Sequence, residues 1–241
     1  MIVEGKNAVQ ELLKSGQTVE KIVVQKDDRS PALSRIAGAA RENGLKVQYA
    51  DRALLDKLSP SGRHQGVVAV ATEYRYYPFE AMLDEALSAE TPALFVLLDG
   101  VEDPHNVGAV LRVADSTAAS GVILPKHRSC GVTDTAVRTS AGAAAHVKVA
   151  KVTNLNDAIR ALKDRGVFVF AADMAGESVY RTDLTGHTAI VIGGENTGVH
   201  TLTKKLADGV ISLPQLGKVN SLNASVAAGV FLYEAVRQRR C

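Results

Sequence analysis

Cysteine is scarce in this sequence. Only Cys130 and Cys241 occur among its 241 residues, and they lie far apart in the sequence. The sequence therefore argues against a disulfide framework and against a zinc site, and it is typical of a reducing compartment. No apolar run approaches the roughly 20 residues of a membrane span, and the start MIVEGKNAVQ lacks a charged and then apolar signal pattern. We expect a cytoplasmic protein.

A strong charge of either sign is also missing, because the formal net charge is only +2. Residues 1–70 hold 11 Lys and Arg against 8 Asp and Glu, residues 71–92 hold 1 against 5, and residues 93–241 hold 16 against 13. Two mildly basic blocks thus flank an acidic stretch. This distribution is compatible with a nucleic-acid partner but does not require one.

The pattern along the chain predicts two α/β domains. In the first block, helical periodicity over 5–16, 30–44 and 51–60 alternates with strand patterns over 19–25, 45–50 and 65–72. An acidic helical stretch between Pro78 and Pro92 is typical of a connector. We therefore expect a domain over residues 1–71, a linker over 72–92 and a second domain over 93–241.

The second domain is expected to be a doubly wound parallel sheet. From residue 93, five or six apolar strands alternate with helical segments, which indicates parallel pairing through right-handed crossovers. Ligands of such sheets usually bind in the loops beyond the carboxyl ends of the strands. Three loops of this domain contain glycines and small amides.

The first loop, DGVEDPHNVGAVLR, follows the strand FVLLD. Pro104 suits a first helical turn, Asn106 offers an amide at the helix start, and Gly108 permits a close approach to the backbone. Arg112 interrupts an otherwise apolar helix, so it calls for a carboxylate or a phosphate as partner. Spacing alone leaves two readings of Arg112 open, a surface residue at the rim of the helix or a phosphate ligand.

The second loop, IVIGGENTGVH, places paired glycines after a strand. Gly193 and Gly194 permit positive φ and a tight turn, and Glu195 brings a carboxylate to the same place. A simple turn with a solvated Glu is the alternative. The dinucleotide fingerprint GxGxxG and the phosphate loop GxxxxGK[ST] are both missing, which disfavours a nucleotide-dependent oxidoreductase.

The third loop precedes the final helix and has the sequence LPQLGKVNSLNAS. Small polar side chains at a helix start can cap it by accepting from free backbone N–H groups. One cap needs one residue, yet Asn220, Ser221, Asn223 and Ser225 all crowd this turn. The surplus of hydrogen-bonding groups predicts a ligand.

Together these loops resemble the motifs of the SpoU/TrmH branch of the SPOUT methyltransferases. The first motif corresponds to residues 106–114 with Gly121, the second to 193–198 including Asn196, and the third to 213–217 and 221–227. The opening VEGKNAV and the closing HQGV of the first block are similar to the small substrate-binding domain of the family. Within the branch the two-domain form is closest to RlmB-type enzymes, which methylate a guanosine ribose in the peptidyl-transferase loop of bacterial 23S ribosomal RNA.

The resemblance implies a fold that periodicity does not reveal. The second domain would be a trefoil-knotted parallel SPOUT sheet, and the first an L30e-like α/β domain that binds RNA. The family also implies a homodimer and S-adenosylmethionine as cofactor, with no need for a metal ion. The expected partner is ribosomal RNA.

The resemblance also implies roles for individual residues. Methyl transfer to a ribose 2′-hydroxyl needs positioning and deprotonation of a poor nucleophile. Arg112 would stand at the hydroxyl, either as a base that relays its proton to a phosphate or as a clamp on that phosphate. The further catalytic residues would be Asn106, Glu195, Ser221 and Asn223. The cofactor would contact Gly193, Gly194, Leu213, Leu222 and Ser221. RNA would contact Lys6, Asn7, Arg29, Arg35, Arg63 and His64.

Two other classes of function stay open at this point. A non-catalytic RNA-binding module would keep the fold and lose Arg112, Glu195 or Asn223, all of which are present. A ribose methyltransferase acting on tRNA or on another ribosomal RNA site, including one that confers antibiotic resistance, would share the same catalytic domain. Target choice would then depend on the first domain and on RNA shape.

Overall fold

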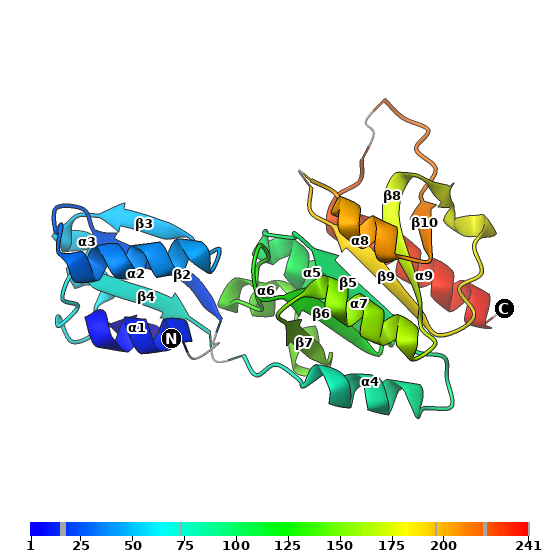
Figure 1. Ribbon diagram of the computed structural model, residues 1–241, viewed down its shortest axis with the longest axis horizontal. Helices are drawn as coiled ribbons and strands as arrows, with labels where there is room; N and C mark the ends of the chain where they lie inside the picture. Colours follow the sequence, from blue (N-terminus) through cyan, green and yellow to red (C-terminus); the bar gives the residue numbers. More distant parts are fainter. Residues whose placement is uncertain (15–17, 73, 196, 219–220, 241) are drawn as a thin grey trace. The chain divides into compact units, whose positions relative to one another are not determined.

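The computed structural model describes residues 1–14, 18–72, 74–195, 197–218 and 221–240. Two compact units divide the chain: Met1–Arg75 with Gly131–Asp134, and Tyr76–Cys130 with Thr135–Cys241. Asn196 and Asn220 of the predicted motifs, and Cys241, lie outside the described residues. Each unit is considered by itself below (Figure 1).

The first unit is a four-stranded mixed sheet with three helices. Its sheet has the order β1-β4-β2-β3, in which β2 and β3 are parallel and the other pairs are antiparallel. The elements are β1 (Ile2–Glu4), α1 (Lys6–Lys14), β2 (Val19–Gln25), α2 (Pro31–Glu42), β3 (Val47–Ala50), α3 (Arg52–Leu58) and β4 (Val67–Ala71). All the predicted elements of this block are present, and β1 is an additional strand too short to show a period in the sequence.

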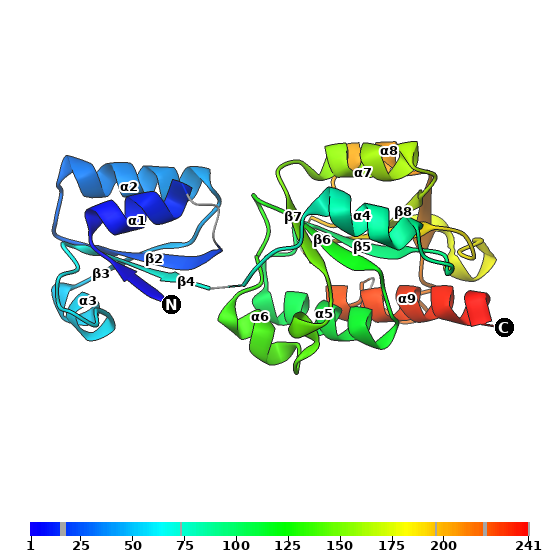
Figure 2. The ribbon, with the colours of Figure 1, turned by 90° about the horizontal axis from the view of Figure 1, so that it is seen from below.

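Both faces of this sheet are covered. Helices α1 and α2 pack on one face, where Val9 and Leu33 bury against Ile22. Helix α3 lies on the opposite face, where Leu55 packs with Val23 (Figure 2). The alternation of buried side chains along β2 therefore supplies two cores, as expected for a strand with a layer on each side.

The second unit contains a six-stranded sheet in the order β10-β8-β9-β5-β6-β7, in which every pair is parallel. Its strands are β5 (Leu94–Asp99), β6 (Gly121–Pro125), β7 (Val149–Val152), β8 (Phe168–Ser178), β9 (Thr188–Gly193) and β10 (Gly209–Ser212). Its helices are α4 (Phe79–Leu87), α5 (Pro104–Ser116), α6 (Asp134–Thr139), α7 (Leu155–Asp164), α8 (Thr201–Leu206) and α9 (Ala224–Arg240), with short 3₁₀ turns η1 (Ala143–Ala145) and η2 (Val179–Arg181). The expected parallel sheet is confirmed.

Helices cover both faces of the second sheet. Figure 2 shows α4, α7 and α8 on one face and α5 and α9 on the other. Strand β5 lies inside the sheet, and all six of its residues are buried, as expected for a parallel strand between two helical layers. Because the strands run parallel, the loops after β5, β9 and β10 leave the sheet at the same edge.

The predicted linker contains a helix that belongs to the second core. Met82 and Leu83 of α4 are fully buried, and a Cβ on Gly121 would lie 2.2 Å from the Met82 sulfur. The backbone N–H of Tyr77 also donates to the carbonyl of Val149 at 2.8 Å. The domain boundaries at residues 71 and 93 stay a prediction.

Candidate active site

Three side chains from the three predicted loops meet in one hydrogen-bonded network. The Glu195 carboxylate oxygen Oε1 accepts from Nδ2 of Asn106 at 3.0 Å and from Nδ2 of Asn223 at 2.8 Å. The same Nδ2 of Asn223 lies 2.8 Å from Oδ1 of Asn106. Residues separated by up to 117 positions in sequence are thus joined. The structure brings together three of the five predicted catalytic residues.

Asn223 both caps the last helix and completes this network. Its Oδ1 accepts from the backbone N–H of Ser225 at 3.0 Å and of Val226 at 3.3 Å, while its Nδ2 faces Glu195. The Ser225 hydroxyl also donates to Oδ1 at 2.6 Å. One asparagine therefore satisfies the first turn of α9 with its oxygen and orients Glu195 with its nitrogen.

The start of α5 holds Asn106 in place. Asp103 caps this helix by accepting from the N–H of His105 at 2.9 Å, and Pro104 occupies the first turn. Asn106 is 5% exposed. Gly108 does permit a close approach, but the approaching group is α6, because a Cβ there would lie 2.5 Å from the Ala136 carbonyl oxygen.

The glycines of the second loop are required by backbone packing. A Cβ on Gly193 would lie 2.1 Å from the carbonyl carbon of Gly198, and one on Gly194 would lie 2.2 Å from the Gly100 oxygen. The positive φ expected at Gly193 and Gly194 occurs instead at Gly198, at +61°. The reason for a glycine pair is therefore close approach of two main chains.

All five predicted cofactor residues line one cavity of about 230 Å³. Its walls are largely apolar, with Ile192, Ile211 and Phe231 among them, while Asp173 and Glu195 add carboxylates. The Lys204 ammonium donates to Asp173 at 2.8 Å and lowers the pKa of that carboxyl. An apolar slot with acidic groups fits a ligand with an aromatic base and positive charges.

A second, more polar cavity of about 210 Å³ adjoins the first at Glu195. Its lining residues are Gly100, Val101, Glu102, Asp103, Asn106, Glu195 and Thr197. Because Glu195 lines both cavities, its network with Asn106 lies between them. The residues of this second cavity other than Asn106 and Glu195 are absent from the sequence-based prediction.

Arg112 and Ser221, the other two predicted catalytic residues, are exposed. Within the described part of the chain, no carboxylate forms an ion pair with Arg112. Ser221 lines the first cavity. His105 is also exposed, with its Nδ1 at 3.3 Å from the Thr139 hydroxyl. No cluster of three or more His, Cys, Asp or Glu that would suit a metal ion occurs among the described residues.

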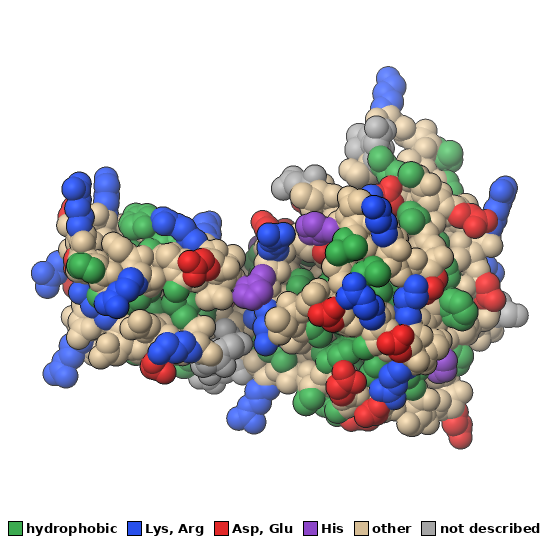
Figure 3. Space-filling view, viewed as in Figure 1, with side chains coloured by type: hydrophobic (Ala, Val, Ile, Leu, Met, Phe, Trp, Pro, Cys, Tyr) green, Lys and Arg blue, Asp and Glu red, His purple; other side chains and the backbone are tan. Residues whose placement is uncertain are grey.

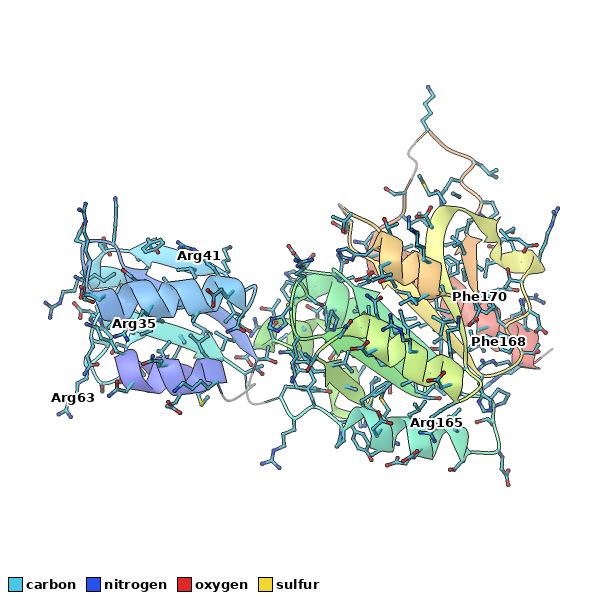
Figure 4. All side chains as sticks on the ribbon, viewed as in Figure 1. Arg35, Arg41, Arg63, Arg165, Phe168 and Phe170 are labelled. Carbon is cyan, nitrogen blue, oxygen red and sulfur yellow. The ribbon has the colours of Figure 1, made fainter. Side chains whose placement is uncertain are left out.

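Of the predicted RNA contacts, Lys6, Arg29 and Arg63 lie on segments that meet in the first unit. The Lys6 ammonium donates to the hydroxyl of Ser30 at 3.3 Å, and the Lys6 N–H donates to Oε1 of Gln65 at 3.1 Å. Asn7, Arg29, Arg35 and Arg63 are exposed. Figure 4 shows Arg63 extending outward, and in Figure 3 Lys and Arg predominate over Asp and Glu on the visible face of this unit.

His64 differs from the other predicted RNA contacts. It is 4% exposed, its Nε2 lies 2.9 Å from an Asp56 oxygen, and its Nδ1 accepts from the N–H of Gly66 at 2.9 Å. Both ring nitrogens are therefore used inside the unit. The structure therefore buries His64, and its ring connects Asp56 of α3 to the backbone of Gly66.

The sequence-based prediction also missed the pair formed by Asp99 and His200. Asp99, the last residue of β5, accepts from Nδ1 of His200 at 2.8 Å and from its backbone N–H at 2.9 Å. A charged residue ending an otherwise apolar strand was the signal available in the sequence. Its partner is the last residue of the second loop and has no motif of its own.

Comparison with known proteins shows the family of this chain. The profile of the SpoU rRNA Methylase family matches residues 93–233, and that of RNA 2′-O ribose methyltransferase substrate binding matches residues 2–77. The chain belongs to the SpoU rRNA methylase family. It is 39% identical over 238 residues to YacO of Bacillus subtilis, which is assigned to the TrmH family of tRNA/rRNA methyltransferases. The alignment covers 98% of this chain and 95% of YacO.

Solved structures agree with this assignment. AviRb, a SpoU methyltransferase of Streptomyces viridochromogenes in complex with S-adenosylmethionine, has a TM-score of 0.61 and 26% identity, over 99% of this chain and 90% of AviRb. An S-adenosylmethionine-bound rRNA methyltransferase of Sinorhizobium meliloti has a TM-score of 0.62 and 27% identity, over 98% of this chain and 86% of that one.

Several expectations are thereby confirmed. This SpoU-family protein is an enzyme that transfers methyl groups from S-adenosylmethionine to ribose 2′-oxygens of tRNA or rRNA, and its first unit is a substrate-binding domain. The SpoU α/β fold of the second unit is likewise confirmed. None of the helices in the described residues is both long and apolar enough to cross a membrane.

Proposed function

We propose that this enzyme methylates the 2′-hydroxyl of a guanosine ribose in the peptidyl-transferase loop of 23S ribosomal RNA. The network of Glu195, Asn106 and Asn223 carries the proposal, because it stands between an apolar cavity and a polar one. The choice of rRNA is supported by the resemblance to RlmB-type enzymes and by the similar rRNA methyltransferase of Sinorhizobium meliloti. A tRNA target is the alternative.

In this proposal the first cavity receives the cofactor. Its apolar walls would hold adenine near Leu213 and Leu222, and Ser221 and the backbone of Gly193 would add polar contacts. S-adenosylmethionine supplies, when bound, an electrophilic methyl group on a positively charged sulfur. The carboxylate of Glu195 places negative charge at this cavity and accepts two amide N–H groups that fix its orientation.

The ribose would lie in the second cavity, against Asn106 and Glu195. Arg112 would act as a clamp for the RNA phosphate beside the target. The guanidinium of Arg112 is exposed and forms no ion pair with a carboxylate of the described residues, and its fork of N–H donors matches a phosphate. Of the two roles predicted for Arg112, exposure favours the clamp over the base.

Binding of the RNA is proposed to begin on the first unit, through Lys6, Asn7, Arg29, Arg35 and Arg63. Structured RNA is held largely through phosphates and 2′-hydroxyls, and unpaired loop bases are read by splaying them out. A peptidyl-transferase loop offers both kinds of contact. Cytoplasmic location, where ribosomal RNA matures, belongs to the same proposal.

We also propose that the enzyme is a homodimer. The exposed side of α9 carries the apolar side chains of Val226 and Tyr233, which are 51% and 53% exposed and two turns apart. Leu222 just before this helix is 41% exposed. A stripe of this kind is typical of a surface that packs against another protein. Light scattering after gel filtration tests this, with Tyr233→Lys expected to shift the mass from two chains to one.

The deciding experiment measures transfer of labelled methyl from S-adenosylmethionine to unmethylated 23S rRNA and, in parallel, to unmethylated tRNA. The position of 2′-O-methylation is mapped from resistance of the adjacent phosphodiester to alkali. We expect label at one guanosine of the peptidyl-transferase loop and its loss with Arg112→Ala. Label on tRNA alone would overturn the proposed target, and label that persists with Arg112→Ala would overturn the role of Arg112.

A further inference from the structure

Asp99 holds both ends of the loop that carries Glu195. Its main-chain carbonyl accepts from the N–H of Gly194 at 2.9 Å, just before Glu195. Its side-chain carboxylate, 9% exposed, accepts twice from His200, once from the backbone N–H and once from Nδ1. One residue at the end of β5 thus fixes the loop at its entry and at its exit.

Further contacts connect the described residues of this loop. The N–H of Gly198 donates to the Gly194 carbonyl at 2.8 Å, which closes the turn on itself. The ring of His200 also packs against Gly100, where a Cβ would lie 3.3 Å from its Cε1 and 3.7 Å from the Thr197 hydroxyl. Gly100 and Thr197 line the polar cavity, so the anchor and the cavity wall are in contact.

We propose that Asp99 and His200 are positioning residues for methyl transfer. By holding both ends of the loop, they keep Glu195 aimed at the amides of Asn106 and Asn223. The inference rests on the proposed function, since it takes Glu195 as a group of the reaction site. A residue that orients a catalytic group from behind acts on the rate without touching the substrate.

The carboxylate at position 99 accepts from the backbone N–H and from Nδ1 of His200 at the same time. In Asp99→Asn the amide oxygen accepts from the backbone N–H, and the amide NH₂ faces Nδ1, which can bond to it only by accepting in the other tautomer; the hydrogen bonds to a carboxylate are lost in either case. Loss of a hydrogen bond to a charged group corresponds to about a 10- to 100-fold effect. We expect Asp99→Asn to lower kcat by that factor and to weaken binding of S-adenosylmethionine, because Gly193, Gly194 and Glu195 line its cavity.

Asp208 provides a matched control. Its carboxylate accepts from the N–H of Val169 at 2.8 Å and pairs with the Lys163 ammonium at 2.9 Å, so like Asp99 it binds one backbone N–H and one basic side chain. It directly precedes β10, at the opposite end of this strand from the cavity residues Ile211 and Ser212. Asp208→Asn should lower the melting temperature without changing kcat by more than about twofold. In Asp99→Asn, by contrast, kcat should fall by a larger factor than the fraction of folded protein does.

Substitutions of His200 test the same contact without disturbing the core, because its side chain is 42% exposed. In His200→Asn the amide nitrogen occupies the place of Nδ1 and donates to Asp99. In His200→Ala this donor is lost. We expect His200→Ala to lower kcat about tenfold and His200→Asn to stay within about threefold of the unmodified enzyme. Equal kcat values for the two variants would overturn the inference.

Hydrogen exchange separates failure of this inference from failure of the proposed function. In Asp99→Asn the amides of residues 193–200 should lose protection, and the double variant with Glu195→Gln should be no slower than Glu195→Gln alone. The inference would be overturned by unchanged protection of these amides in Asp99→Asn, or by a double variant whose loss of rate is the product of the two single losses. Lost protection with unchanged kcat would show that the loop is held as described but that Glu195 has no part in the reaction.

Discussion

Replacing Asn223 by Asp separates the two tasks of this side chain. Its Oδ1 caps α9, and its Nδ2 donates to Glu195 and Asn106. Asp is as good a helix cap as Asn, so the melting temperature should change little. The new carboxylate, however, has an acceptor in place of the Nδ2 donor, so the hydrogen bonds to Glu195 and Asn106 are lost. It also faces the Glu195 carboxylate, and the two groups repel each other.

The magnitude follows from the hydrogen bonds lost. A hydrogen bond to a charged group contributes about 1.5–3 kcal/mol, and each 1.4 kcal/mol is about a factor of ten in rate. We therefore expect Asn223→Asp to lower kcat by about 10- to 100-fold from the lost donor, with repulsion adding to it. Asn223→Ala removes the cap as well, which costs about 1 kcal/mol of stability and lowers the melting temperature by about 2–4 °C.

The pH dependence of Asn223→Asp gives the sharpest check. Two facing carboxylates raise each other's pKa, so one of them takes up a proton at a higher pH than an isolated carboxyl would. Protonation restores an O–H donor between positions 195 and 223, and the rate relative to the unmodified enzyme should rise as the pH falls. Methyl transfer is measured from pH 5 to 8 beside thermal unfolding. Full activity of Asn223→Asp at pH 8 would refute the role of this network.

Three further predictions address other parts of the chain. Arg112→Ala should lower kcat at least 100-fold while leaving the melting temperature unchanged, because the exposed guanidinium pairs with no described carboxylate; a lower melting temperature would contradict this. Gly194→Ala should lower the free energy of unfolding by about 1–3 kcal/mol, since its Cβ would meet Gly100, whereas Gly186→Ala, with open space around it, should not; unfolding in urea measures both. Buried Glu234 has its pKa lowered below 4.5, first by hydrogen bonds from a neighbouring arginine. Its contribution to stability is therefore present above about pH 4.5 and lost as the pH falls through the lower value in the folded state, so Glu234→Gln should flatten the acid loss of stability seen by calorimetry.

The fold could be predicted well from local patterns. The apolar runs over residues 94–99 and 188–193 are buried on both sides and admit only a central parallel strand. The strand β1 escaped prediction because three residues carry no period. The order of strands, with β9 between β8 and β5, depends on long-range packing that a period of two or 3.6 residues does not encode.

The residues of the candidate site could be predicted where a sequence motif directly follows a strand, and less well elsewhere. Asn106, Glu195 and Asn223 meet as expected because parallel strands bring their carboxyl ends to one edge. The positive φ predicted for Gly193 and Gly194 is wrong, since these glycines permit close contact between main chains, which is a property of the folded loop. The residue type of His64 predicts an RNA contact, whereas both of its nitrogens are used inside the unit.

The partners of Glu195 have a consequence for the cofactor. Both of its hydrogen-bond donors are neutral amides, so its negative charge is oriented by the protein without being cancelled by them. This charge lines the proposed cofactor cavity and should favour the sulfonium of S-adenosylmethionine over the neutral sulfur of S-adenosylhomocysteine, which would help release of the product. A screened interaction of this kind is worth about 1 kcal/mol, or a factor of about five. In Glu195→Gln, calorimetric titration should show the ratio of the two affinities shifted by that factor toward the product, and an unchanged ratio would mean that Glu195 acts on the ribose alone.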